Sequence, residues 1–133
     1  MKKIFTLLSL ILLTSTFSGC EVLADCLING RAKLYDRTFP TATVGNYYSE
    51  KVGSEVTNEP NDDNYYYNFD VAGEIPPGLV YSFDYRDVHF YGVPDEPGTY
   101  TFTIYLNVDH KDIYEEDCFN DDTDSKTYSI TVE

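Results

Sequence analysis

The chain contains no tryptophan, three cysteines and two histidines in its 133 residues. Neither Cys26 nor Cys118 has another cysteine or a histidine at the short spacing of a zinc site, so structural zinc is not expected. No Gly-x-Ser-x-Gly turn, His-Glu-x-x-His helix or glycine-rich phosphate loop occurs, so we expect no enzyme. The lack of tryptophan also removes the largest ring on which a sugar can stack, although tyrosine can take its place.

Basic residues are scarce as well, since nine Lys and Arg face 23 Asp and Glu, for a formal net charge of −14. Lys2 and Lys3 lie in the N-terminal segment described next, so without that segment the balance is 7 − 23 = −16. This charge argues against nucleic acid and against anionic lipid headgroups as partners. It favours solubility and encounter with a basic protein or a cation.

No apolar run is long enough to span a membrane, because residues 4–13 supply about half of the roughly twenty residues required. The run follows two lysines and precedes small residues, which is the layout of a secretory signal. Its exit, Phe17-Ser18-Gly19-Cys20, resembles the lipobox of bacterial lipoproteins. The resemblance implies a signal peptide at residues 1–19, lipidation of Cys20 and a short tether over residues 20–26. The protein would then be anchored to a membrane of the bacterial cell envelope.

A second cleavage site competes with this one. Val22-Leu23-Ala24 has the small-x-small form of an ordinary signal-peptide cut, and Phe17 stands where a lipobox usually has an aliphatic residue. Cleavage after Ala24 would give a soluble secreted or periplasmic protein. Both cuts deliver an even pair of cysteines, Cys26 and Cys118, to an oxidising compartment, where we expect a disulfide.

The rest of the chain shows strand-like alternation and no helical spacing. Apolar side chains at even positions of residues 100–108 alternate with mostly polar ones, and residues 127–132 repeat the pattern. Turn signals such as Pro76-Pro77-Gly78 separate the segments. We predict an all-β sandwich of about seven strands. The strands are expected at residues 27–34, 47–56, 65–71, 79–83, 88–91, 100–108 and 127–132.

Three motifs follow one another at short intervals: Ile75–Leu79 contains PPGL, Val88–Pro94 ends in Gly-x-Pro, and Pro97–Ile104 contains GTYTFT. In this order they resemble the immunoglobulin-like and cadherin-like modules common in bacterial surface proteins. The resemblance implies one immunoglobulin-like β-sandwich over residues 27–133. It implies no particular activity.

The same topology predicts two details. Tyr100 has the place of a tyrosine corner, with Phe102 at the inward position that a cysteine occupies in antibody domains, so apolar packing should replace that bridge. Cys26, just before the first strand, and Cys118, in the last connection, should lie at the same pole of the sandwich, which makes their disulfide geometrically plausible.

Acidic residues gather in two segments that this topology brings to that pole, residues 58–64 and 109–126. Carboxylates from two loops can coordinate Ca²⁺. No EF-hand spacing or cadherin calcium motif is present, so a solvated acidic rim is the alternative. The candidate calcium ligands are Asp62, Asp63, Asp121, Asp122 and Asp124.

We therefore expect a structural or protein-interaction module with no catalytic residues and no resident cofactor, unless it binds calcium. Two alternatives stay open: an acidic inhibitor or binder of a basic envelope enzyme, and a calcium-dependent adhesion or glycan-binding module. Consecutive tyrosines at residues 47–48 and 65–67 must place rings on both faces of their strands. Some of these rings should be exposed and available for protein or glycan contacts.

Overall fold

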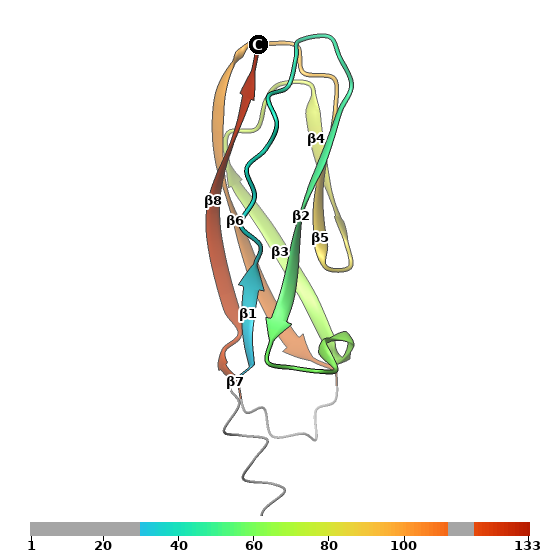
Figure 1. Cartoon of the computed structure of the whole chain (residues 1–133), viewed down its shortest axis with the longest axis vertical. Helices are drawn as coiled ribbons and strands as arrows, with labels where there is room; N and C mark the ends of the chain where they lie inside the picture. Colours follow the sequence, from blue (N-terminus) through green and yellow to red (C-terminus); the bar gives the residue numbers. More distant parts are fainter. Residues whose placement is uncertain (1–29, 112–118) are drawn as a thin grey trace, which may run out of the picture.

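The computed structural model describes residues 30–111 and 119–133, and Figure 1 shows them as an elongated sandwich of β-strands. Within these residues no helix is long and apolar enough to cross a membrane. The elements are β1 (Gly30–Leu34), β2 (Tyr48–Thr57), the 3₁₀ helix η1 (Asp62–Asn64), β3 (Tyr65–Gly73), β4 (Leu79–Asp84), β5 (Asp87–Gly92), β6 (Gly98–His110), β7 (Phe119–Asp121) and β8 (Thr123–Val132).

The strands form two sheets with the orders β4-β5-β2-β1-β7 and β3-β6-β8. Apart from β7, this is the ABED and CFG arrangement of a constant-type immunoglobulin domain. The predicted all-β, immunoglobulin-like sandwich is therefore confirmed. The seven expected strands correspond in order to β1 to β6 and β8. The bounds of β2 to β6 and β8 differ from the expected ones by one to four residues at one end or both, and the expected start at residue 27 lies outside the described residues.

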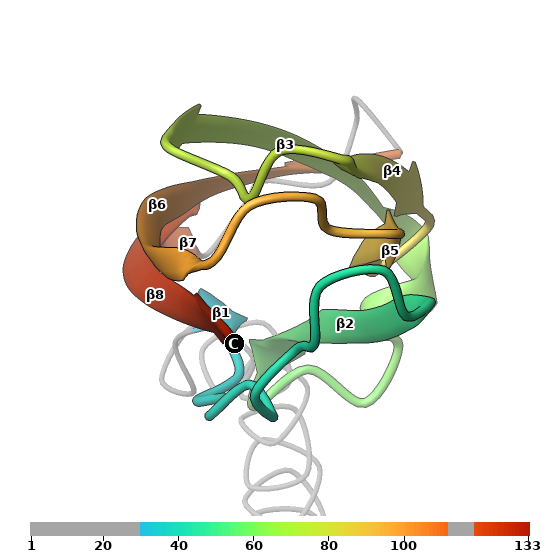
Figure 2. The ribbon, with the colours of Figure 1, turned by 90° about the horizontal axis from the view of Figure 1, so that it is seen from above.

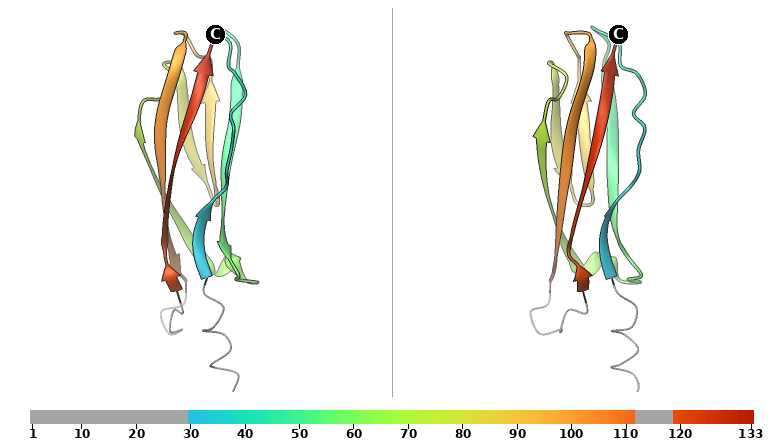
Figure 3. Two further views of the ribbon diagram at one scale, coloured as in Figure 1. Left: turned by 60° about the vertical axis from the view of Figure 1, so that its left-hand side comes forward. Right: turned by 90° about the vertical axis from the view of Figure 1, so that its left-hand side faces the viewer.

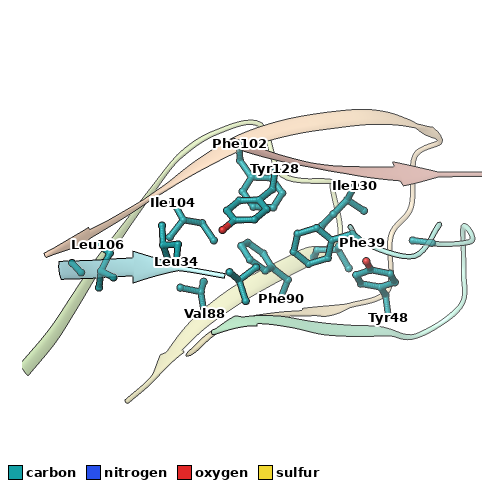
Figure 4. Packing of buried hydrophobic residues seen from close by; sticks show 14 of the residues in the cluster. Leu34, Phe39, Tyr48, Val88, Phe90, Phe102, Ile104, Leu106, Tyr128 and Ile130 are labelled. Carbon is teal, nitrogen blue, oxygen red and sulfur yellow. The ribbon is translucent and has the colours of Figure 1, made fainter. Parts of the chain in front are cut away.

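An aromatic cluster fills the centre of the sandwich (Figure 4). Phe102 of β6 is 1% exposed, and its ring centroid lies 4.7 Å from that of Phe90 on β5. Phe39 packs edge-on against Phe90 at 5.8 Å, and Tyr128 of β8 lies 6.1 Å from Phe102. Rings from both sheets thus meet where antibody domains place their disulfide, as predicted for Phe102.

The tyrosine corner is also present. The hydroxyl of Tyr100 donates a hydrogen bond to the carbonyl oxygen of Glu96 at 3.3 Å. This bond ties the start of β6 to the connection that precedes it, which is the role of the corner in immunoglobulin-like sandwiches.

Two of the three family motifs interlock at the end of the sandwich where the chain terminates. Gly78 follows the two prolines of PPGL, and its carbonyl oxygen accepts a hydrogen bond from the Val93 N–H at 3.2 Å. Gly78 has φ +86°, and a Cβ atom there would lie 2.1 Å from the carbonyl oxygen of Val93. The glycine is required both by its left-handed backbone and by the close approach of the second motif.

We expect Gly78→Ala to lower the free energy of unfolding by at least about 2 kcal/mol, because strain at positive φ adds to a clash with backbone. Gly45→Ala is the matched control, since Gly45 has φ +78° but a Cβ atom added there would meet no other atom within 4 Å. Gly45→Ala should lower the free energy of unfolding only by the cost of placing a non-glycine residue at positive φ, about 1 kcal/mol. Urea unfolding of both variants measures the difference, and equal losses would show that the contact with Val93 has no effect.

The last connection is shorter than predicted, because β8 begins at Thr123 and pairs with β6 as far as Asn107. Asp124 was expected in an acidic loop but lies in β8, and Asp109 and His110 lie in β6. The first half of β8 could not be predicted from hydrophobic alternation, because residues 123–127 are all polar. Its outward side is polar, and its inward Asp124 and Lys126 hydrogen-bond to other segments.

Candidate functional site

The cation at the centre of the acidic pole is Arg86, in the turn between β4 and β5, and the Lys111 ammonium lies next to it and donates to the Asp63 carbonyl oxygen. The two terminal nitrogens of Arg86 donate to the two carboxylate oxygens of Asp62 at 2.7 Å each, and one of them also contacts the carboxylate of Asp63. The guanidinium carbon lies 5.5 Å from the ring centroid of Tyr67 and 5.2 Å from that of Tyr85. Such bidentate, stacked geometry is specific to arginine.

Burial by itself lowers the pKa of Arg86, but the hydrogen bond with Tyr85 and the charges of Tyr67 and Asp62 outweigh it. The pKa of the guanidinium is therefore raised above its ordinary value, and Arg86 is positively charged. Arg86 fastens η1 and the β4–β5 turn to each other. Sequence reasoning missed it because no local pattern connects residues 62 and 86.

This arrangement bears directly on the calcium prediction. The Asp62 and Asp63 carboxylates already face a cation that belongs to the protein, and Asp124 accepts the Leu34 N–H at 2.7 Å. Residues 58–64 and the end of β6 do converge, since the Lys111 N–H donates to the Asn64 carbonyl oxygen at 2.8 Å. Within the residues that the structure describes, no three acidic, histidine or cysteine side chains form a group that could hold a metal.

The remaining predicted site residues have different outcomes. Asp122 is exposed, and its carbonyl oxygen accepts the Val108 N–H at 2.8 Å, while Asp121 is the last residue of β7. Cys20, Cys26 and Cys118 lie outside the described residues. Lipidation, the disulfide and calcium binding therefore stay predictions.

Arg86→Ala should destabilise the domain by about 2 kcal/mol, because it leaves two carboxylates without their cation in a partly solvated site. Arg86→Lys keeps the charge but loses the fork and the stacking, so it should recover less than half of the loss. Lys33→Ala, which breaks the exposed Lys33–Glu55 ion pair, is the control and should change stability little. Urea unfolding of the three variants measures these stabilities. If Arg86→Lys is as stable as the parent, the bidentate geometry of the guanidinium contributes nothing to stability.

The two long sides of the sandwich differ. On one side, backbone hydrogen bonds join the segment after β1 to the end of β8. The Ala42 N–H donates to the Thr131 carbonyl oxygen at 2.8 Å, and the Glu133 N–H donates to the Ala42 carbonyl oxygen at 2.9 Å. β7 pairs in parallel with β1 before the chain enters β8. On the other side β3 and β4 are the outer strands of their sheets and do not pair with each other (Figures 2 and 3).

Aromatic rings fill this open side, which we call the aromatic seam. Phe69 of β3 stacks on Phe83 of β4 at 5.8 Å, Phe83 lies 5.6 Å from Tyr81, and Tyr67 lies 5.7 Å from Tyr85. Phe83 is 48% exposed although it belongs to the inward-facing side of its strand. The seam is thus an opening of the core to solvent, flanked by two free strand edges.

The exposed tyrosines predicted from the sequence are found. Tyr47 and Tyr66 are exposed, whereas their neighbours Tyr48 and Tyr65 are buried. Burial raises the pKa of Tyr48 to about 12, and its hydroxyl donates to the Pro40 carbonyl oxygen at 3.1 Å. Tyr66 forms part of the outer face of the β3-β6-β8 sheet.

A family model described as "Putative Ig domain" matches residues 33–133. The chain belongs to this immunoglobulin-like family. Membership confirms the immunoglobulin-like module implied by the three motifs and suggests a structural or adhesion-type role.

Solved structures share the architecture at low sequence identity. An endo-fucoidan hydrolase of glycoside hydrolase family 107 is 16% identical with a TM-score of 0.50, over 79% of this chain and 14% of that one. A candidate alpha-galactosidase from Bacteroides fragilis is 14% identical with a TM-score of 0.48, over 80% and 18%. The SrpA adhesin of Streptococcus sanguinis is 13% identical with a TM-score of 0.46, over 79% and 60%.

This chain thus spans less than a fifth of the length of the two hydrolase structures. At such identities the likeness shows the fold alone. A comparison with curated protein sequences finds no match.

Proposed function

We propose that this protein is a lipid-anchored, non-catalytic module of the bacterial cell envelope that binds a basic protein partner through the aromatic seam. The exposed rings of the seam carry the proposal. Monomeric proteins rarely leave contiguous apolar surface open to water, and where they do it usually serves an interaction. Tyrosine and phenylalanine are also enriched where proteins meet.

The free edges of β3 and β4 add a second attraction. Each edge presents backbone N–H and carbonyl groups with no strand beside it, and an extended partner segment can add to such an edge. A partner strand laid along the seam would cover Tyr81 and Phe83 while pairing its backbone. The acidic balance of the chain would steer a basic partner to it.

A lipid anchor at Cys20 would give the domain a defined orientation. From Cys20 to Cys26 the chain spans at most about 20 Å when extended, so the domain would stand close to the bilayer. The start of β1 and the C-terminus lie at opposite ends of the sandwich (Figure 1). The pole that carries Arg86 would then face the membrane, and the seam would run away from it.

Mass spectrometry of the mature protein tests the anchor. We expect a chain that begins at Cys20 and carries acyl groups. A chain that begins at unmodified Asp25 would contradict the anchor and support the soluble, secreted alternative. Neither result affects the seam, which depends on the folded domain alone.

A photo-crosslinking amino acid at position 83 tests the seam in the native host. We expect one defined crosslinked product, whose partner is basic and whose yield falls as ionic strength rises. The same amino acid at position 47, which is exposed just before β2 and away from the seam, is the control. Identical products from both positions, or none from position 83, would contradict the proposal. If the captured partner is an envelope hydrolase that loses activity when bound, the inhibitor alternative is supported.

A further inference from the structure

The outer face of the β3-β6-β8 sheet has an unusual composition. Its outward positions are mostly Ser, Thr and Asn, and none of these outward positions is Lys or Arg. The other sheet differs, because Lys33 and Lys51 point outward there and pair with Glu55 and Asp87. The described structure therefore offers one uncharged-to-acidic polar face and one face of mixed charge.

Near the middle of the first face lies an open hollow of about 650 Å³. The floor of the hollow consists of two rows of paired residues, each row running across β3, β6 and β8. One row joins Asp70, Tyr105 and Ser125, and the next joins Asn68, Asn107 and Thr123. All six residues line the hollow.

Tyr105 is the aromatic residue among these six, and the residue is 48% exposed. An exposed ring offers an apolar surface for the C–H groups of a sugar ring. The amides, hydroxyls and carboxylate around it provide both donors and acceptors for sugar hydroxyls. An apolar platform with a few convergent polar groups in a hollow is the general form of a small-molecule site.

Part of this polar set is held in place before any ligand arrives. The Asn68 amide nitrogen donates to the Asp109 carboxylate at 2.9 Å. Further along the face the hydroxyls of Thr103 and Thr127 lie 2.9 Å apart. Side chains that are already ordered lose less entropy on binding, which favours affinity.

We propose that a neutral oligosaccharide binds in this hollow, with one sugar ring on Tyr105 and its hydroxyls on Asn68, Asn107 and Asp70. Acidic glycans are disfavoured because the strands of this face turn no lysine or arginine outward and Asp70 and Asp109 would repel them. Lys111 follows β6 and lies over the Tyr66 ring, one outward residue from Asn68, but its ammonium is engaged there by the Tyr66 and Tyr85 rings and donates to the Asp63 carbonyl oxygen. The site and the aromatic seam lie on opposite faces of β3, which turns Asn68 and Asp70 outward here and Tyr67 and Phe69 inward there, although Phe69 also borders the hollow.

Affinity electrophoresis of the purified mature protein tests the proposal. Native gels would contain hydroxyethyl cellulose, galactomannan, xyloglucan or dextran as neutral probes and alginate as an acidic one. We expect retardation by at least one neutral polysaccharide and none by alginate. Tyr105→Ala should weaken binding at least about tenfold, because it removes the stacking surface, and Tyr105→Phe should keep most of it.

Asn68→Ala and Asn107→Ala should each weaken the same binding severalfold through lost hydrogen bonds. Tyr47→Ala, at an exposed tyrosine outside the hollow, is the matched control and should bind as the parent does. Retardation by none of the neutral probes, retardation by alginate alone, or equal binding by the parent and Tyr105→Ala would each overturn the proposal. Melting temperatures of all variants exclude unfolding as the cause. Phe83→Ala in the seam, at a residue that does not line the hollow, should leave this readout unchanged, so the two proposals fail independently.

Discussion

Phe102→Ala is expected to lower the free energy of unfolding by about 3–5 kcal/mol, because a large buried ring leaves both lost burial and a cavity. Phe102 contacts Phe90, Phe39 and Tyr128, so its removal affects rings from both sheets. Small domains have a total stability of roughly 5–15 kcal/mol. For a domain of this size the melting temperature should therefore fall by well over about 10 °C.

Phe83→Ala is the matched control, since the same side chain is removed from the aromatic seam. It loses the stacking with Phe69 and part of its burial, so the expected cost is about 1 kcal/mol. Thermal and urea unfolding of both variants measure the ratio. Equal costs would mean that the seam is a working part of the core, and the seam could then not be free to bind a partner.

The sequence carried enough information to predict the architecture because two kinds of signal agreed. Strict alternation of apolar and polar residues predicted which face of β6 is buried. The PPGL and Gly-x-Pro motifs marked the backbone contact between Gly78 and Val93, which only glycine permits. Both signals are local, and both survive in a single sequence. The tyrosine corner could be predicted for the same reason, since Tyr100 and Glu96 are four residues apart.

The surface could be predicted only in part. The pairing of Arg86 with Asp62, the stacking of Phe69 on Phe83 and the hollow beside Tyr105 all join residues far apart in the chain. Nothing local distinguishes a carboxylate that faces an arginine from one that awaits a metal. One local signal does exist: threonine at every second position from 99 to 103 marks a polar sheet face once β6 is known to be central.

Alkaline pH is expected to unfold the domain through its buried tyrosines. Burial raises the pKa of Tyr48 to about 12, that of Tyr67 to about 12 and that of Tyr128 further above its ordinary value. In the unfolded chain these phenols ionise near pH 10. Because the folded pKa values are raised, the folded state holds these protons more tightly. Their contribution to stability is fully present below about pH 10 and is lost as the pH rises from about 10 through 12.

For Tyr48 alone the loss at about pH 12 should be on the order of 2–3 kcal/mol, since each unit of pKa difference corresponds to about 1.4 kcal/mol. Urea unfolding at pH 8, 10, 11 and 12 should show stability that is level to about pH 10 and then falls steeply. Tyr48→Phe should flatten part of that fall, because it removes one buried ionisable group, at the expense of the hydrogen bond to Pro40 at all pH values. Tyr47→Phe, at the neighbouring residue, which is 69% exposed, is the matched control. If both variants flatten the curve equally, burial of the Tyr48 phenol is not the cause of alkaline unfolding.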